Sequence, residues 1–172
     1  MNSNAIKYGV ISGIVSIIFS MALYFINPKM MFGGLAYLGM LIPVFFMWKA
    51  SNDEKKINEG YLPFGEALII SFIVVAIALL ISSIFTYILI NFIDPSLVDV
   101  IKEISIEAAE KVAGIFGADE DSLDEMRDQM DEQDLRPTIF TTLFNYLGSL
   151  VVGFIIALIV AAIVKKTRPY GA

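Results

Sequence analysis

Residues 67–93 read ALIISFIVVAIALLISSIFTYILINFI, a stretch of 27 residues without a single Asp, Glu, Lys or Arg. Eighteen of them are Leu, Ile, Val or Phe. At about −0.3 to −0.6 kcal/mol for each, their transfer into a bilayer is favourable by roughly 5 to 11 kcal/mol. At about 1.5 Å per residue, a helix of this length can cross a hydrocarbon core of roughly 30 Å. The stretch therefore predicts a transmembrane helix.

Three further uncharged apolar runs, at 8–26, 30–48 and 138–164, are long enough for the same purpose. The run 30–48 is the least regular, and for it a re-entrant segment is the alternative, because it contains Gly33, Gly34, Gly39 and Pro43. The chain of 172 residues is 57% hydrophobic, with a mean hydropathy of +0.73, which exceeds what a soluble core of this size needs. We predict an all-α integral membrane protein with four transmembrane helices, forming a single membrane domain over 1–172.

The charges are strongly segregated along the chain. Segment 94–137, between the third and fourth runs, holds 14 of the 18 acidic residues and 4 of the 12 basic ones, a net charge of −10 that leaves +4 elsewhere. The short flanks 1–7, 49–66 and 165–172 carry seven basic residues in 33 positions. Basic residues concentrate on the cytoplasmic side of membrane proteins. This predicts an orientation with both termini in the cytoplasm and the acidic loop 94–137 outside.

The acidic loop shows helical periodicity. Asp94-Pro95-Ser96 is typical of a helix start, and apolar residues then recur at spacings of three and four, which predicts an amphipathic helix over about 95–116 that ends at Gly117. A capping box at Ser122 predicts a second arm, and hence an acidic helical hairpin. Its apolar seam would contact the other arm, the membrane or a partner, and the contact candidates are Leu97, Ile101, Ile104, Val112 and Ile115.

The acids between 119 and 134 are dense enough to attract divalent cations, but they do not match the spacing of an EF-hand, so we favour a solvated, charged surface and predict no metal site. Small residues at helical spacing form stripes in the first and fourth runs. They serve either as a seam between two copies of the chain or, as we favour, as packing within its own helix bundle. These candidates are Gly9, Gly13, Ser149, Gly153, Ala157 and Ala161.

The residue inventory excludes most catalytic chemistry. The chain has no Cys and no His, no P-loop or dinucleotide fingerprint, and no charged residue within the four runs. We therefore predict no catalytic residues, no cofactor and no enzyme activity. No dense basic patch is available to neutralise phosphates, so a nucleic-acid partner is not expected.

Short motifs at the helix boundaries are similar to a known family. Lys7-Tyr8-Gly9 enters the first run, Phe64-Gly65-Glu66-Ala67 opens the third, and Ile93-Asp94-Pro95 closes it. In these features the chain resembles the bacterial membrane proteins of domain of unknown function 4199, found mainly in the Bacteroidetes. The resemblance implies an inner-membrane location and brings no activity or site residues.

Two hypotheses for function follow. The first is a non-enzymatic membrane protein that acts through protein interaction, with the acidic loop presented to a second copy or to another membrane or periplasmic protein. The alternative is a subunit of an oligomeric channel or transporter. Beyond these, the partner expected from composition is the lipid bilayer.

Overall fold

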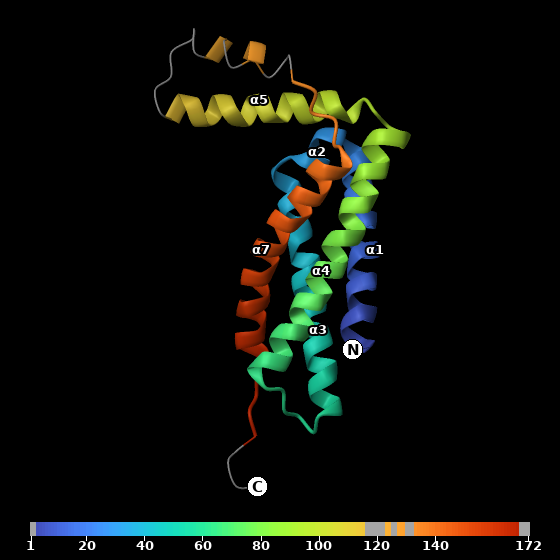
Figure 1. Ribbon diagram of the computed structural model, residues 1–172, viewed down its shortest axis with the longest axis vertical. Helices are drawn as coiled ribbons and strands as arrows, with labels where there is room; N and C mark the ends of the chain where they lie inside the picture. Colours follow the sequence, from blue (N-terminus) through green and yellow to red (C-terminus); the bar gives the residue numbers. More distant parts are fainter. Residues whose placement is uncertain (1–2, 116–122, 125–126, 130–132, 169–172) are drawn as a thin grey trace.

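A computed structural model describes residues 3–115, 123–124, 127–129 and 133–168 of the chain. The four helical stretches Ser3–Ile26, Gly34–Ile57, Phe64–Ile93 and Ile139–Val164 are long and apolar enough to cross a membrane. The chain is therefore an all-α, multi-pass membrane protein, as the sequence predicts. The spans run along the long axis of the molecule, and a further helix lies across one end of them (Figure 1). We call this end the loop end and the opposite end the termini end.

The first span is helix α1, Ser3–Ile26, which begins five residues before its apolar run. Its early start is explained by a contact with the third helix, where the amide of Asn4 donates a 3.0 Å hydrogen bond to Glu54. At the loop end the chain turns into the short helix α2, Pro28–Phe32. Asn27 caps α2 by accepting a 2.9 Å hydrogen bond from the Lys29 amide, and proline follows at the first helical position.

The second span is displaced along the chain from the apolar run 30–48. Residues 30–32 belong to α2, a 3₁₀-helix η1 covers Gly34–Met40, and the α-helix α3 covers Leu41–Ile57. Helix α3 thus extends well past the apolar run into a charged segment. It does so because one of its faces is packed in the bundle, where Met47, Ala50 and Ser51 are fully buried. Tertiary packing, rather than hydropathy, decides where this helix ends.

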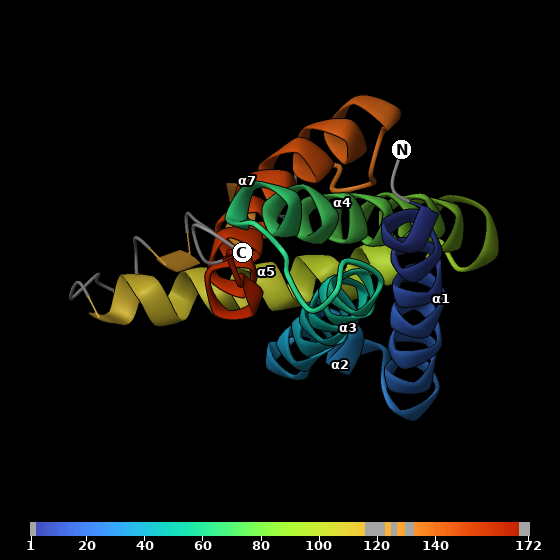
Figure 2. The ribbon, with the colours of Figure 1, turned by 90° about the horizontal axis from the view of Figure 1, so that it is seen from below.

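The third span lies at the centre of the bundle. It consists of α4, Phe64–Ile88, and a final π-helical turn η2, Leu89–Ile93. Helix α4 contacts α1, α3 and the fourth span, so that α3 and α4 lie between the first and fourth spans when the bundle is viewed from the termini end (Figure 2). The turn before α4 contains Gly60 at a φ of +87°, a conformation that glycine adopts without steric cost.

The fourth span is α7, Ile139–Val164. It starts at a capping box, in which the Thr138 hydroxyl accepts from the Thr141 amide at 3.1 Å and the Thr141 hydroxyl accepts from the Thr138 amide at 2.8 Å. At its far end, the backbones of Leu62 and Lys166 exchange two hydrogen bonds of 2.8 Å. This pairing joins the α3–α4 loop to the segment after α7 at the termini end.

The helix across the loop end is α5, Leu97–Ile115, which occupies most of the amphipathic segment expected over 95–116. Its first turn is part of a core cluster in which Leu97 packs with Met31, Leu89 and Ile90. Gly117, Ser122 and most of the expected second arm lie outside the described residues, as do most of the acids between 119 and 134, so the hairpin and the cation alternative stay predictions.

Candidate functional site

The helices α4 and α7 are packed together toward the termini end and part toward the loop end. Gly153 permits the close approach, because a Cβ atom there would lie 3.1 Å from a methyl group of Val75. One and two turns further toward the termini end, Ala157 and Ala161 are fully buried. Toward the loop end, by contrast, none of the α7 residues 139–150 is buried. A pocket lies where the two helices separate.

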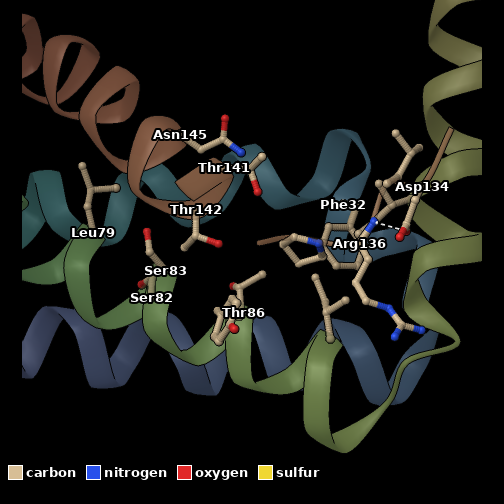
Figure 3. Close-up of a pocket in the computed structure, with 15 residues that line it drawn as sticks. Phe32, Leu79, Ser82, Ser83, Thr86, Asp134, Arg136, Thr141, Thr142 and Asn145 are labelled. Carbon is tan, nitrogen blue, oxygen red and sulfur yellow. Dashed lines mark hydrogen bonds between the residues drawn. The ribbon is translucent and has the colours of Figure 1, made fainter. Parts of the chain in front are cut away.

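This pocket has a volume of about 480 Å³ and polar groups on both of its long walls (Figure 3). Helix α4 contributes Ser82, Ser83 and Thr86, and α7 contributes Thr141, Thr142 and Asn145. The apolar part of the lining comes from four elements and includes Leu79, Ile90, Phe32 and Ile101. Because Phe32 belongs to α2 and Ile101 to α5, the elements at the loop end cover the pocket.

Most of the polar groups in the pocket have unused hydrogen-bonding capacity. Within the described residues, no hydrogen bond involves the side chains of Ser82, Ser83, Thr86, Thr142 or Asn145. Hydroxyl groups in apolar surroundings usually find a partner. These side chains are therefore available to a ligand that enters the pocket.

The rim of the pocket carries one positive and one negative side chain, Arg136 and Asp134. The Arg136 amide donates a 3.0 Å hydrogen bond to the Asp134 carboxylate, which makes a tight turn before α7. Across the described part of the chain, the Arg136 guanidinium makes no hydrogen bond or ion pair. Both side chains are exposed. The rim thus presents two opposite charges side by side, neither neutralised by the other.

An apolar recess of about 210 Å³ continues the pocket between α4 and α7. The two cavities share Ser83, Tyr87 and Thr142. The remaining lining of the recess is mostly apolar and comprises Leu80, Ile84, Ile139, Leu143 and Tyr146. Several of these side chains belong to the exposed apolar surface of the spans, so the recess is open toward the membrane. At its inner end, the Tyr146 hydroxyl donates a 3.3 Å hydrogen bond to the Ala76 carbonyl of α4.

The cover over the pocket is held by polar contacts at the start of α5. The Asp94 carboxylate accepts hydrogen bonds from the Ser96 hydroxyl at 2.5 Å and the Tyr24 hydroxyl of α1 at 2.8 Å. These bonds, the one from Ser96 first, lower the pKa of Asp94 below its ordinary value because they favour the charged form. Lys29 of α2 forms an ion pair with Glu103 of α5, which raises the pKa of Lys29.

The small residues singled out in the sequence pack within the chain, with one exception. Gly9 and Gly13 of α1 lie against Ile77 and Ile81 of α4, where an added Cβ would come within 2.8 Å of each isoleucine Cβ. Gly153, Ala157 and Ala161 lie in the bundle as described above. Ser149 does not, since it is exposed and donates a 2.8 Å hydrogen bond to the Asn145 carbonyl of its own helix.

The exposure of the loop residues singled out as contact candidates increases from the start of α5 to its end. Leu97 is 1% exposed and contacts the bundle, and Ile101 lines the pocket. Ile104 is half-buried, whereas Val112 and Ile115 are 55% and 82% exposed. Only the far end of the seam is therefore free for contact with anything other than the chain itself.

The pocket was not anticipated from the sequence, although a signal for it exists. Both helices carry polar residues at positions i, i+1 and i+4, which are Ser82, Ser83 and Thr86 on α4 and Thr141, Thr142 and Asn145 on α7. Such a pattern places three polar side chains on one helix face. That the two faces oppose each other becomes apparent only when the helices are packed.

Comparison with known proteins gives one match. Residues 7–166 match the family described as "Protein of unknown function (DUF4199)". No match was found among curated proteins or solved structures. The match covers nearly the whole chain, including the pocket, the whole acidic segment 94–137 and all of the four spans except the first four residues of α1. The chain therefore belongs to the DUF4199 family of proteins of unknown function.

Proposed function

We propose that this chain is a non-enzymatic protein of the bacterial inner membrane that binds an amphiphile at its extracytoplasmic end. In this arrangement both termini are cytoplasmic and loop 94–137 is outside. The observation that carries the proposal is the pocket between α4 and α7, where unpaired hydroxyl groups and two rim charges adjoin an apolar recess open to the membrane. The interaction role expected for the acidic loop becomes a role in ligand binding, because Ile101, Asp134 and Arg136 are part of the lining.

The composition of the pocket favours a zwitterionic head group. Arginine binds phosphate groups in a bidentate geometry, and a carboxylate pairs with an ammonium group. Arg136 and Asp134 on one rim therefore suit a phospholipid head group that carries both. A net anion would also meet repulsion from the acidic loop, whose net charge is −10. The acyl chains would follow the recess along Ile84 and Leu143 into the bilayer.

The volume of the pocket is adequate for such a head group. At about 480 Å³ it lies within the range of roughly 300–1,000 Å³ typical of small-molecule sites. The hydroxyl groups of Ser83 and Thr142 would bond to the ester and phosphate oxygens. Because these hydroxyls have no partner within the described part of the chain, such bonds would add to affinity without breaking existing ones.

The test is native mass spectrometry of the purified protein with an equimolar mixture of phosphatidylethanolamine and phosphatidylglycerol. The wild type is expected to retain the zwitterionic lipid. Arg136→Gln should bind it about tenfold more weakly, as expected for losing one hydrogen bond to a charged group. Asp134→Asn should shift the preference toward phosphatidylglycerol, because the head-group amine loses its partner.

Two further variants complete this experiment. Ser83→Phe should fill the pocket and reduce retention of either lipid. Arg168→Gln is the matched control, because Arg168 lies at the termini end, where it pairs with Glu59 at 2.7 Å, and it should behave like the wild type. Equal retention by wild type, Arg136→Gln and Ser83→Phe, or a wild-type preference for the anionic lipid, would contradict the proposal.

The alternative of a channel or transporter subunit is less well supported by the geometry. The polar lining ends where Gly153 packs against Val75, so within one described chain the pocket is a blind recess rather than a path. A conducting path would have to form between copies. Ion and solute flux in vesicles containing the purified protein would test this alternative, and absence of flux for several ions would count against it.

A further inference from the structure

Helix α5 lies across the loop end of the spans, and its C-terminal half extends beyond the bundle (Figures 1 and 2). Its 19 residues correspond to about 28 Å of helix. Only the first part, around Leu97, is packed against α4 and α2. The second half therefore projects over whatever surrounds the spans at this level, which in a membrane protein is the surface of the bilayer.

The projecting half presents an apolar face in the direction of the spans. Leu97, Ile101, Ala108, Val112 and Ile115 recur at spacings of three, four and seven, which places them on one face of the helix. The face begins against the bundle, with Leu97 at 1% exposure, and ends with Val112 at 55% and Ile115 at 82%. Side chains on one face of a straight helix point in the same direction along its whole length. Val112 and Ile115 therefore point to the side on which Leu97 is buried.

The apolar face also lies at the level where the apolar surface of the spans begins. Ile101 of α5 lines the same pocket as Pro137 and Thr141, which flank the first turn of α7. In that turn Ile139 and Phe140 are 70% and 84% exposed, as expected for side chains that face lipid. The apolar face of α5 is thus continuous with the lipid-facing surface of α7.

The other faces of α5 carry charge. Glu103 and Glu107 lie on the flank near Lys29 of α2, with which Glu103 pairs, whereas Asp99 and Glu110 occupy the side away from Leu97. Glu110 pairs with Arg127 at 2.6 Å, so that part of the acidic loop covers this side. A helix with one apolar face and a charged opposite face is typical of helices that lie in the membrane interface. Segment 94–137, to which α5 belongs, has a net charge of −10, so an uncharged or zwitterionic lipid surface is favoured over anionic lipid, which would repel it.

We propose that the second half of α5, Ala108–Ile115, lies in the head-group layer of the leaflet at the loop end, with Val112 and Ile115 inserted among the acyl chains of zwitterionic lipid. The proposal requires that the four spans cross a bilayer, but not that the pocket binds a ligand. It assigns the exposed end of the seam to the lipid surface rather than to a protein partner. It also makes α5 a membrane-anchored cover of the pocket, to whose wall it contributes Ile101.

The absence of cysteine from the chain allows a direct test. Single-cysteine variants Val112→Cys, Ile115→Cys and Glu110→Cys are labelled with a small fluorophore in the full-length protein, reconstituted in phosphatidylcholine vesicles. Quenching by brominated acyl chains should be at least about twofold stronger at positions 112 and 115 than at the control position 110, because only the apolar face reaches the acyl layer. Thermal unfolding of each variant verifies that it is folded.

A second experiment with the same labelled variants tests which class of lipid α5 contacts. Replacing half of the lipid by phosphatidylglycerol at low salt should reduce the quenching at position 115, and 0.5 M salt should restore it by screening the repulsion. Equal quenching at all three positions would overturn the proposal. So would labels at 112 and 115 that are shielded from both brominated lipid and aqueous iodide, since that result would indicate a protein partner or a second copy. Stronger quenching with anionic lipid would overturn the assignment to zwitterionic lipid.

Discussion

Single residues set the distance between the central helix and its neighbours. Gly9 and Gly13 allow α1 to lie directly on Ile77 and Ile81, in the way that small residues bring transmembrane helices together. Their spacing was visible in the sequence and favoured packing within the bundle, with a dimer seam as the alternative. The choice between the two depended on which helix supplies the opposing surface.

We expect Gly9→Ala to destabilise the protein by about 1–3 kcal/mol, because the added methyl would lie 2.8 Å from the Cβ of Ile77 and force the helices apart. Gly148→Ala is the matched control. It is also a helical glycine, but nothing lies within 4 Å of the added atom. Thermal unfolding in detergent measures both. Equal stability of the two variants would show that α1 and α4 are not in close contact at Gly9.

Asp94 should make the stability of the α5 junction depend on pH. Its pKa is lowered in the folded state, so its contribution is complete above the ordinary aspartate value of about 3.9 and is lost as the pH falls through the folded value. We expect Asp94→Asn to lower stability by about 1 kcal/mol at pH 7, because two hydrogen bonds to a charged acceptor are weakened. The difference from the wild type should shrink below about pH 4. A difference independent of pH between 7 and 3 would contradict this prediction.

At the scale of elements, the pocket exists because α7 is held at both ends but not along its loop-end half. Its far end is packed against α4 through Gly153, and its start is tied by Asn91 to η2, the last turn of the third span. The Asn91 amide donates 3.0 Å hydrogen bonds to the carbonyls of Tyr87 and Pro137. The Asn91 side chain thus joins the end of the third span to the segment that leads into α7.

We expect Asn91→Leu to loosen the start of α7, because the Pro137 carbonyl loses its partner on η2. Hydrogen–deuterium exchange of residues 139–145 should become faster, while exchange near Gly153 stays unchanged. Asn145→Leu serves as control, since no hydrogen bond within the described residues involves the Asn145 side chain. Unaltered exchange in Asn91→Leu would show that the capping box at Thr138 alone holds this helix start.

At the scale of the whole molecule, the three base-rich flanks come together at one end. Asn4 contacts Glu54, and Leu62 pairs with Lys166, so 3–7, 49–66 and 165–168 share the termini end. Helix α5, the longest described element of the acidic loop, lies at the other end (Figure 1). This polarity of charge is what the topology proposal rests on, because positively charged flanks are retained in the cytoplasm.

Fusions of a reporter that is active only outside the cytoplasm, placed at positions 58, 118 and 172, test this orientation. We expect activity at 118 and none at 58 and 172. The reverse pattern would show that the protein has the opposite orientation, with the pocket and α5 at the cytoplasmic leaflet.

The sequence by itself determined the four apolar helices, the amphipathic character of α5 and the segregation of charge, because these are properties of consecutive residues and of their preference for lipid or water. The end of α3 at Ile57 could not be predicted from consecutive residues, since it depends on burial of Ala50 and Ser51 against other helices. Only the tertiary structure decided that the polar faces of α4 and α7 oppose each other and that the two helices part beyond Gly153. A pocket between spans is formed by side chains that are distant in sequence, and no local pattern specifies which faces meet.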